Sequence, residues 1–226
     1  MMNKEKIVIL GHGGFARELA WLIHEINRAQ THPRLELLGF VVSDLSKTEN
    51  PKACLGDYNW LEKNRSQWTA LALGIGSPKA RAAVSAQIDR EFRDVHWPTL
   101  IHPSVNMDWD SCKIEQGSLL CANVIGTVNL KINEFSLINL SCTLGHESEI
   151  GSHSVINPSV NVSGGVTIGK QALIGTGAQI LQNLNLGDHV TVGAGAVVTK
   201  NVESGLVVTG VPAQPRIKVN SAQNGQ

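Results

Sequence analysis

His146 and Glu147 are neighbours in the sequence, and side chains of these two types can move a proton. An imidazole with an ordinary pKa of ~6.5 accepts a proton at neutral pH, and a nearby carboxylate stabilises its charged form. The pair is therefore a candidate general base, with His146 as the base and Glu147 as its acidic partner. The alternative is a solvated pair without a chemical role, because both residue types are common on protein surfaces.

A glycine-rich stretch near the start of the chain has the residue types that bind phosphate. Residues 11–16 read GHGGFA and follow the apolar run KIVIL, so they match the GxGxxA pattern of dinucleotide-binding turns. Backbone N–H groups in the first turn of a helix favour an anionic ligand. The candidate substrate-binding residues are Gly11, His12, Gly13, Gly14, Asp44 and Gly76.

The position of Asp44 separates three interpretations of this stretch. In an NAD site an acidic residue binds the ribose about 20 residues after the glycines. Asp44 lies nearer to 30 residues after them, so we favour a nucleotide or nucleotide sugar over NAD. A purely structural glycine turn is the third interpretation. His12 fits a ligand contact and a solvated loop equally well.

The residues around the glycines predict a domain in which strands and helices alternate. Apolar runs predict strands over 6–10, 35–42 and 69–75, and 95–101 is a candidate for one more. An amphipathic pattern predicts a helix over about 15–30, and Ser77 and Pro78 suit the start of a second helix that ends near Glu91. This order predicts a Rossmann-like parallel sheet over residues 1–98, with ligands beyond the carboxyl ends of its strands.

The second half of the chain repeats every six residues. Every sixth residue from Ile132 to Val198 is Ile, Leu or Val, and the residue four positions further on is small or aliphatic, as at Ser136 and Cys142. A helix would repeat every 3.6 residues and a half-buried strand every two. The repeat therefore predicts a parallel β-helix over residues 99–213, in which each coil buries its aliphatic row against its neighbours.

Gly or Asn often follows the aliphatic residue of the repeat, for example at Asn133, Gly145 and Gly175. We expect these residues to form the corners of the coils, because Gly and Asn adopt positive φ at little cost. Chance alternation in a β-sandwich would lose its phase at the first irregular loop, which twelve successive matches argue against. Residues 214–226 contain few apolar side chains and are expected to form a C-terminal tail with a disordered end.

Composition argues against several classes of protein. Lys plus Arg and Asp plus Glu are equal at 19 each and aromatic residues make up only 4%, so neither a nucleic acid nor an anionic membrane is an expected partner. No apolar run is long enough for a membrane span or a signal peptide, and we expect no membrane insertion. The four cysteines lack metal-ligand spacing, so we expect no metal and four reduced, buried thiols in a cytoplasmic protein.

Five motifs give the chain a resemblance to a known family. They are GHGGFARE at 11–18, Leu55-Gly56-Asp57, Ile101-His102-Pro103, Gly145-His146-Glu147 and Gly210-Val211-Pro212-Ala213. In this combination the chain resembles the bacterial sugar O- and N-acyltransferases of the sialic-acid O-acetyltransferase and bacillosamine-pathway N-acetyltransferase group, which carry hexapeptide repeats. The resemblance covers nearly the whole chain, short of the tail. It implies a left-handed β-helix, a homotrimer, acetyl-CoA bound between neighbouring β-helices, and a sugar nucleotide on the N-terminal domain.

The resemblance also assigns roles to single residues. His146 is similar to the catalytic base of the family, Glu147 to its acidic partner, and Asn139 to a polar active-site residue. The cofactor-binding residues that it implies are Gly164, as a backbone donor to the thioester carbonyl, and Thr176 and Ala194, as backbone contacts of the pantetheine arm.

Two further positions bear on this assignment. Many relatives have a second active-site His where this chain has Val155, and His153 is two positions away, so the resemblance gives no second His contact to the acyl group. Cys142 is a weaker candidate for a nucleophile. It occupies the small, inward position of its repeat, so we expect a packed thiol.

The leading hypothesis is an acetyl-CoA-dependent acetyltransferase that acts on an amine or hydroxyl group of a sugar, most simply a nucleotide-linked amino sugar. An NAD-linked sugar enzyme would instead use the glycine-rich stretch, and thermal stabilisation by the cofactor would distinguish the two. A trimeric scaffold without activity would bind no acetyl-CoA at all. The sequence leaves open which sugar and nucleotide are used and whether nitrogen or oxygen is acetylated.

Overall fold

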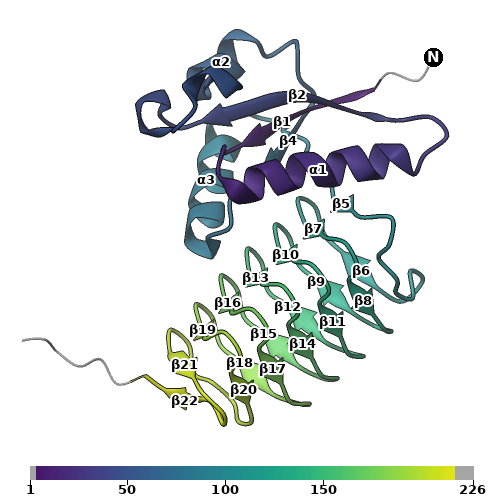
Figure 1. Ribbon diagram of the computed structural model, residues 1–226, viewed down its shortest axis with the longest axis vertical. Coiled ribbons are helices and arrows are strands. Elements are labelled where there is room, and N and C mark those ends of the chain that lie inside the picture. The colour runs from purple at the N-terminus through teal and green to yellow at the C-terminus, as the bar shows by residue number, and fades with distance from the viewer. Residues whose placement is uncertain (1–3, 217–226) are drawn as a thin grey trace, which may run out of the picture.

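The computed structural model describes residues 4–216 and shows an α/β domain above a β-solenoid (Figure 1). The four strands of the N-terminal domain are parallel and lie in the order β3-β2-β1-β4, which is the order of a Rossmann half. They are β1 (Glu5–Leu10), β2 (Leu35–Val42), β3 (Cys54–Asp57) and β4 (Ala70–Leu73). The helices are α1 (Gly14–Arg28), α2 (Tyr58–Lys63) and α3 (Pro78–Glu91), with single 3₁₀ turns at Leu45–Lys47 and Pro51–Ala53.

The ends of these helices follow the predicted signals. Gly13 is the N-cap of α1 and has no side chain to cap it, so the first N–H groups of the helix face outward. Ser77 caps α3 by accepting a hydrogen bond from the Ala80 N–H, and Pro78 occupies the first turn, as predicted. The Rossmann-like sheet expected from the sequence is confirmed.

One expectation for this domain was wrong, and one strand was missed. Residues 95–101 do not form one strand of its sheet, because only His96 makes a bridge to Ala70 while Leu100–Ile101 (β5) pairs with the solenoid. The strand β3 was not predicted, since the run CLGD is short and has no alternating pattern. Tertiary pairing with β2, rather than local propensity, makes it a strand.

The second domain is a parallel β-helix built from three sheets, as the repeat predicted, and it is left-handed, as the resemblance implied. From β6 to β20 each strand residue pairs with one eighteen positions away, such as Leu137 with Val155, so three hexads form one coil. The first sheet, here called the domain-facing sheet, contains β5 (Leu100–Ile101), β7 (Leu119–Leu120), β10 (Leu137–Ile138), β13 (Val155–Ile156), β16 (Leu173–Ile174), β19 (Thr191–Val192), β21 (Val207–Thr209) and β22 (Gln214–Pro215).

The other two sheets contain five strands each. The second sheet contains β8 (Ile125–Gly126), β11 (Thr143–Leu144), β14 (Asn161–Val162), β17 (Gln179–Ile180) and β20 (Val197–Val198). The third sheet contains β6 (Lys113–Ile114), β9 (Lys131–Ile132), β12 (Glu149–Ile150), β15 (Thr167–Ile168) and β18 (Asn185–Leu186). The tail begins as β22, which pairs antiparallel with β21, and its expected disordered end at 217–226 lies outside the described residues.

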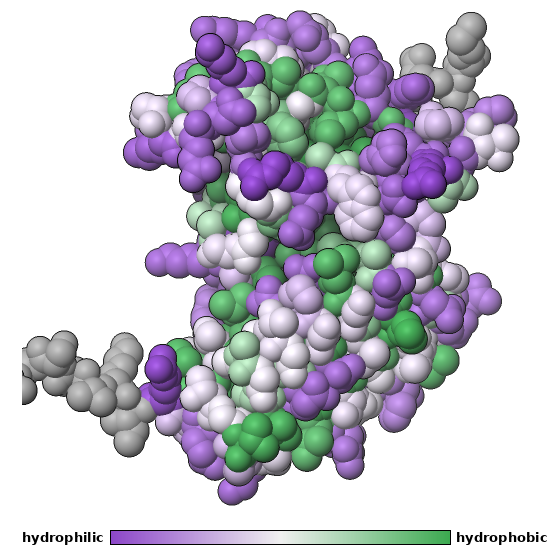
Figure 2. Space-filling view, viewed as in Figure 1, coloured by the Kyte–Doolittle hydropathy of each residue, from purple (hydrophilic) through white to green (hydrophobic). Residues whose placement is uncertain are grey.

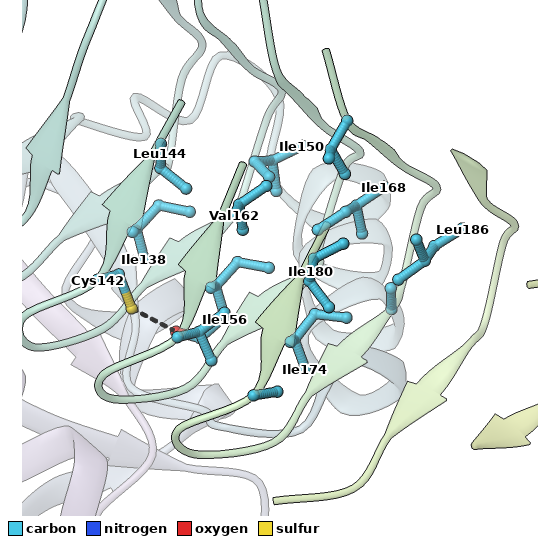
Figure 3. Close-up of a cluster of buried hydrophobic side chains, with 14 of the residues drawn as sticks. Ile138, Cys142, Leu144, Ile150, Ile156, Val162, Ile168, Ile174, Ile180 and Leu186 are labelled. Carbon is cyan, nitrogen blue, oxygen red and sulfur yellow. Dashed lines mark hydrogen bonds between the residues drawn. The ribbon is translucent and has the colours of Figure 1, made fainter. Parts of the chain in front are cut away.

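The interior of the solenoid consists of the aliphatic residues that define the repeat. Ile138, Ile156 and Ile174 stack from coil to coil, and similar rows run along the other two sheets (Figure 3). The small position is also buried, and its polar members hydrogen-bond to the next coil, as Ser136 does to the Gly151 carbonyl. Both inward rows are thus confirmed.

The expected role of the glycines in the repeat was wrong. Positive φ occurs three residues after every aliphatic position from Ile132 to Val192, at residues such as Phe135 and Glu147, and not at the Gly or Asn that follows it directly. The glycines are needed for another reason. A Cβ on Gly145 or Gly175 would overlap the backbone of the next coil, which runs at the close spacing of paired strands.

The two domains are packed together through the domain-facing sheet. Leu19, Leu22 and Ile23 of α1 share an apolar cluster with outward side chains of that sheet, including Val155. On the face in Figure 2, apolar residues are visible in the recess between the domains. The solenoid edge nearest to α3 runs through Phe135 and His153 and is called the Phe135 edge.

Arg81 of α3 ties this edge to the N-terminal sheet. The side chain is fully buried, and its guanidinium donates to the Phe135 carbonyl from Nε at 3.0 Å and from Nη2 at 2.8 Å. Nη1 donates to the carbonyls of Leu73 and Ile75 at 3.1 and 2.9 Å. Burial lowers the pKa of Arg81 to about 9, which still leaves it charged at neutral pH.

We expect the substitution Arg81→Met to lower the free energy of unfolding by about 2–4 kcal/mol, because three buried carbonyls would lose their donor. Urea unfolding would measure the change, and Lys79→Met on the exposed face of the same helix is the control. A loss below about 1 kcal/mol would show that Arg81 does not hold the two domains together.

Candidate functional site

His146 and Glu147 lie at the corner between β11 and β12, on the edge where the second and third sheets meet. This edge, which also includes Asn129 and Gly164 from the neighbouring coils, is called the His146 edge. Both side chains are exposed, His146 by 63% and Glu147 by 57%. Glu147 adopts the left-handed conformation, with φ of 55°, which turns its side chain out beside the imidazole. Nδ1 of His146 is hydrogen-bonded to Oε2 of Glu147.

This contact determines which nitrogen of His146 can act as a base. A carboxylate accepts hydrogen bonds, so Nδ1 carries the proton and the lone pair of the neutral ring is on Nε2. The hydrogen bonds from His146 and then from Asn129 hold the pKa of Glu147 below its ordinary value, so the carboxylate stays ionised at neutral pH. The geometry is therefore that of a base with its acidic partner.

Gly164 lies directly under Nε2 of His146. A Cβ added to Gly164 would overlap the imidazole, so the close approach of the ring requires glycine at this position. The N–H of Gly164 donates to no residue in the described part of the chain, although the neighbouring Gly165 N–H donates to the His146 carbonyl. A basic nitrogen and a free backbone donor thus occur at one place, as acyl transfer requires.

The other implied contacts of the acyl donor lie on a different edge. Thr176 and Ala194 occupy successive coils on the edge where the domain-facing and second sheets meet, here called the Thr176 edge. Their N–H groups also donate to no residue within 4–216. Asn139 is on the Thr176 edge as well, buried, with its side chain accepting from the Leu140 N–H. Within one chain the structure therefore does not bring Asn139, Thr176 or Ala194 beside His146.

Position 155, where many relatives have a histidine, holds a valine that packs between the two domains. Val155 is buried against α1 in the cluster between the domains, where a charged imidazole would be costly. His153 stacks on Phe135 at the Phe135 edge and hydrogen-bonds to Ser85, and burial lowers its pKa to about 4. Neither residue reaches the His146 edge.

The cysteines behave mostly as expected. Cys142 is fully buried, with its Sγ at 3.8 Å from the Ile156 carbonyl (Figure 3). The Asn157 carbonyl lies closer, at 3.1 Å from the same sulfur. Burial raises its pKa to about 11, so the packed thiol is confirmed. Cys121 is also buried, but Cys54 and Cys112 are only partly so, which corrects the expectation that all four are interior.

The glycine-rich stretch lines a cleft of about 970 Å³ at the carboxyl ends of β1, β2 and β4. The cleft brings together five of the six candidate residues, which are Gly11, His12, Gly13, Gly14 and Asp44. A Cβ on Gly13 or Gly14 would meet no atom within 4 Å, so the start of α1 opens into free space. Gly76 does not line the cleft, although its neighbour Ile75 does.

Asp44 has structural partners within this cleft. Its carboxylate accepts hydrogen bonds from the N–H and hydroxyl of Ser46 and pairs with Lys47 at 3.0 Å, and these contacts lower its pKa to about 2. The lining residues that sequence reasoning missed include Arg17, Lys47, Glu49 and Tyr58. Arg17 lies in the first turn of α1, directly after the glycines, and this spacing could have predicted that it lines the cleft. Arg17 beside the N-terminus of α1 suits an anionic group such as a phosphate, while Lys47 is already paired with Asp44 and Glu49 adds a second carboxylate to the lining.

Residues 4–216 contain no group of three or more His, Cys, Asp or Glu side chains placed to hold a metal ion. No helix in this part of the chain combines the length and the apolar composition that a membrane span requires.

Comparison with known proteins supports the fold and the repeat. Residues 165–200 match the family model described as bacterial transferase hexapeptide (six repeats). No curated protein matches the chain by sequence.

Three solved structures have the same architecture over almost the whole chain. PerB from Caulobacter crescentus, in complex with CoA and GDP-perosamine, is 23% identical with a TM-score of 0.83, and the match covers 96% of this chain and 98% of that one. The acetyltransferase domain of PglB from Neisseria gonorrhoeae, in complex with acetyl coenzyme A, is 25% identical with a TM-score of 0.81, and covers 95% and 100%. WeeI from Acinetobacter baumannii is 23% identical with a TM-score of 0.64, and covers 94% and 100%. The expected resemblance to sugar acyltransferases with hexapeptide repeats is confirmed.

Proposed function

We propose that the chain is an acetyltransferase that moves an acetyl group from acetyl-CoA to the amine of a nucleotide-linked amino sugar. The observation that carries this proposal is the His146 edge, where Nε2 of an oriented imidazole lies over Gly164 and its free N–H. PerB and PglB, which share the fold, were solved with CoA or acetyl-CoA, and PerB also with a nucleotide amino sugar. A cytoplasmic location, as the free cysteines suggest, is part of the proposal.

Each residue of the His146 edge has its own role in the direct transfer of the acetyl group. Nε2 of His146 takes a proton from the sugar nitrogen as that nitrogen forms its bond to the acyl carbon. Glu147 holds the protonated imidazole, and the Gly164 N–H donates to the carbonyl oxygen as negative charge develops there. The carbon–sulfur bond then breaks, and the leaving thiolate of CoA accepts a proton. No covalent enzyme intermediate is needed.

The positions of the two sites support an assembly of more than one chain. The N-terminal domain covers the domain-facing sheet, and the His146 edge is the corner of the prism opposite that sheet. A sugar held in the cleft of one chain is therefore turned away from His146 of the same chain. In a homotrimer, one chain would supply His146 and Gly164, and its neighbour the Thr176 edge for the pantetheine arm. If light scattering shows that the active protein is a monomer, the proposed trimer with a shared site is contradicted.

The alternatives have less support. An NAD-linked enzyme would need an acidic residue for the ribose, yet the carboxylate of Asp44, which the sequence offered for that role, already binds Ser46 and Lys47. A scaffold would not need an imidazole held between a carboxylate and a glycine. Release of CoA thiol from acetyl-CoA, measured across nucleotide amino sugars and free sialic acids, tests the proposal directly. Release with none of the acceptors would refute it.

We expect Gly13→Val to raise KM for the sugar nucleotide at least about tenfold and to leave KM for acetyl-CoA unchanged. Space at Gly13 is open, so the fold should accept valine, but the side chain would block the N–H groups that bind an anion. His24→Val, on the exposed face of the same helix, is the control for the effect of valine on helix stability. An equal rise in both KM values would argue against separate sites for the two substrates.

A further inference from the structure

Glu147 contacts a second side chain on the His146 edge that the proposed reaction has not used so far. Asn129, from the preceding coil, donates from Nδ2 to Oε1 of Glu147 at 3.3 Å, while Oε2 of the same carboxylate holds Nδ1 of His146. The two oxygens of Glu147 are thus bound to different partners. The contacts form a line from Asn129 through Glu147 to His146 and end above Gly164.

Asn129 is itself fixed by the coil before it. Its backbone N–H donates to the hydroxyl of Ser111 at 2.9 Å, and that hydroxyl donates to Oδ2 of Asp108 at 2.6 Å. The residue adopts the left-handed conformation with φ of 57°, which places its side chain outward at the corner, one coil from Glu147.

The exposure of the pair explains why a second contact matters. An exposed ion pair is held weakly, since the solvent screens it and the long carboxylate side chain has several rotamers of similar energy. A carboxylate bound through only one oxygen would leave the imidazole for part of the time. Bound through both oxygens, it keeps Nδ1 protonated and Nε2 over Gly164.

We propose that Asn129 is a positioning residue, which orients Glu147 so that His146 presents Nε2 to the acceptor. This inference rests on the proposed function, in which His146 is the base. Asn129 touches neither the substrate nor the reacting atoms in this account, and acts only through the carboxylate.

Asn123 provides a matched control within the same solenoid. It has φ of 61°, and its N–H donates to the hydroxyl of Ser104 at 2.8 Å, so its backbone repeats the conformation and bonding of Asn129. Its side chain makes no hydrogen bond to any residue in the range 4–216. The two residues therefore differ in the carboxylate that only Asn129 contacts.

The test uses Asn129→Gly and Asn129→Asp in the full-length protein. Glycine keeps the left-handed backbone and removes the donor, and we expect kcat to fall about tenfold with both KM values unchanged, as when the partner of a functional imidazole is lost. Aspartate keeps the shape and the backbone preference but repels Glu147, so kcat should fall further than with glycine. Gln171→Gly, at a left-handed position with φ of 54° on the Phe135 edge, should leave kcat within about twofold.

Which of the two variants loses more kcat distinguishes a positioning role from a structural one. If Asn129 only stabilised the corner, aspartate would be the milder change, and that order would overturn the proposal. In a Glu147→Ala background, where there is no carboxylate to orient, Asn129→Gly should have no further effect on kcat. Additive losses would also overturn it.

A second measurement does not depend on activity. Loss of the Asn129 donor should raise the pKa of Glu147 towards its ordinary value, as followed by carboxyl NMR with Glu147→Gln as the assignment control. The pKa should not change in Asn123→Gly. An unchanged pKa in Asn129→Gly would reject the positioning role, whereas a wild-type protein without any transfer activity would reject the proposed function alone.

Discussion

We expect His146→Ala to lower kcat about 10²–10⁴-fold and to leave the Kd of acetyl-CoA unchanged. Removal of a general base typically has an effect of this order, because the nucleophile must then lose its proton to water. The alanine side chain is shorter than the imidazole and should fit, since the side chain of His146 is exposed and nothing packs over it. The corner itself is held by backbone contacts, such as that from the Gly165 N–H to the His146 carbonyl, which the substitution leaves in place.

Steady-state kinetics with the preferred acceptor would measure kcat, and calorimetric titration would measure the affinity for acetyl-CoA. His24→Ala, an exposed histidine on α1, is the control and should keep its full activity. If kcat of His146→Ala stays within threefold of the parent, His146 is not the base, and deprotonation by the substrate itself becomes the better mechanism.

The second large effect is expected for Gly164→Ala, which adds one methyl group and should lower kcat by at least about 10²-fold. The new Cβ would overlap Nε2 of His146, so the imidazole must move away from the place where it meets the acceptor. A displacement of about 1 Å in a catalytic group is enough for a loss of this size. The φ of Gly164 lies outside the left-handed region, so the loss would not come from backbone strain.

Thr167→Ala, an exposed residue on the third sheet in the same coil, controls for the effect of a small change on the solenoid. The melting temperatures of the two variants should be similar, because His146 can turn outward into solvent. Activity of Gly164→Ala within twofold of the parent would mean that the imidazole works from a different rotamer, and would remove Gly164 from the site.

The six-residue repeat allowed the β-helix to be predicted from the sequence. Every sixth residue from Ile132 to Val198 must be aliphatic because it points into an interior that only neighbouring coils fill. The pattern is local, so no knowledge of distant contacts was needed. For the same reason the cap at Ser77 and the glycine-rich turn at Gly11–Gly14 could be predicted, since each depends on residues within one turn.

Other features depended on contacts between coils or domains. Gly145 was expected to be a corner residue with positive φ and Gly164 a backbone donor, but the neighbouring coil and the imidazole of His146 determine that no side chain fits at these positions. Val155 is buried by packing between the domains, and Leu100–Ile101 forms a strand by pairing with β7 of the solenoid. Neither contact can be predicted from the residues nearby in the sequence.

The candidate site also combines features that the local sequence predicts with features that depend on tertiary contacts. Adjacent residues such as His146 and Glu147 could be paired from the sequence, because one peptide bond keeps them together. Asn129 lies seventeen residues before His146 and reaches the pair only because one coil of the solenoid returns the chain to the same edge. The sequence alone thus determined the repeat and the candidate catalytic pair. The winding of the coils decided which distant side chains lie beside them, since contacts across eighteen residues follow from the three-dimensional register.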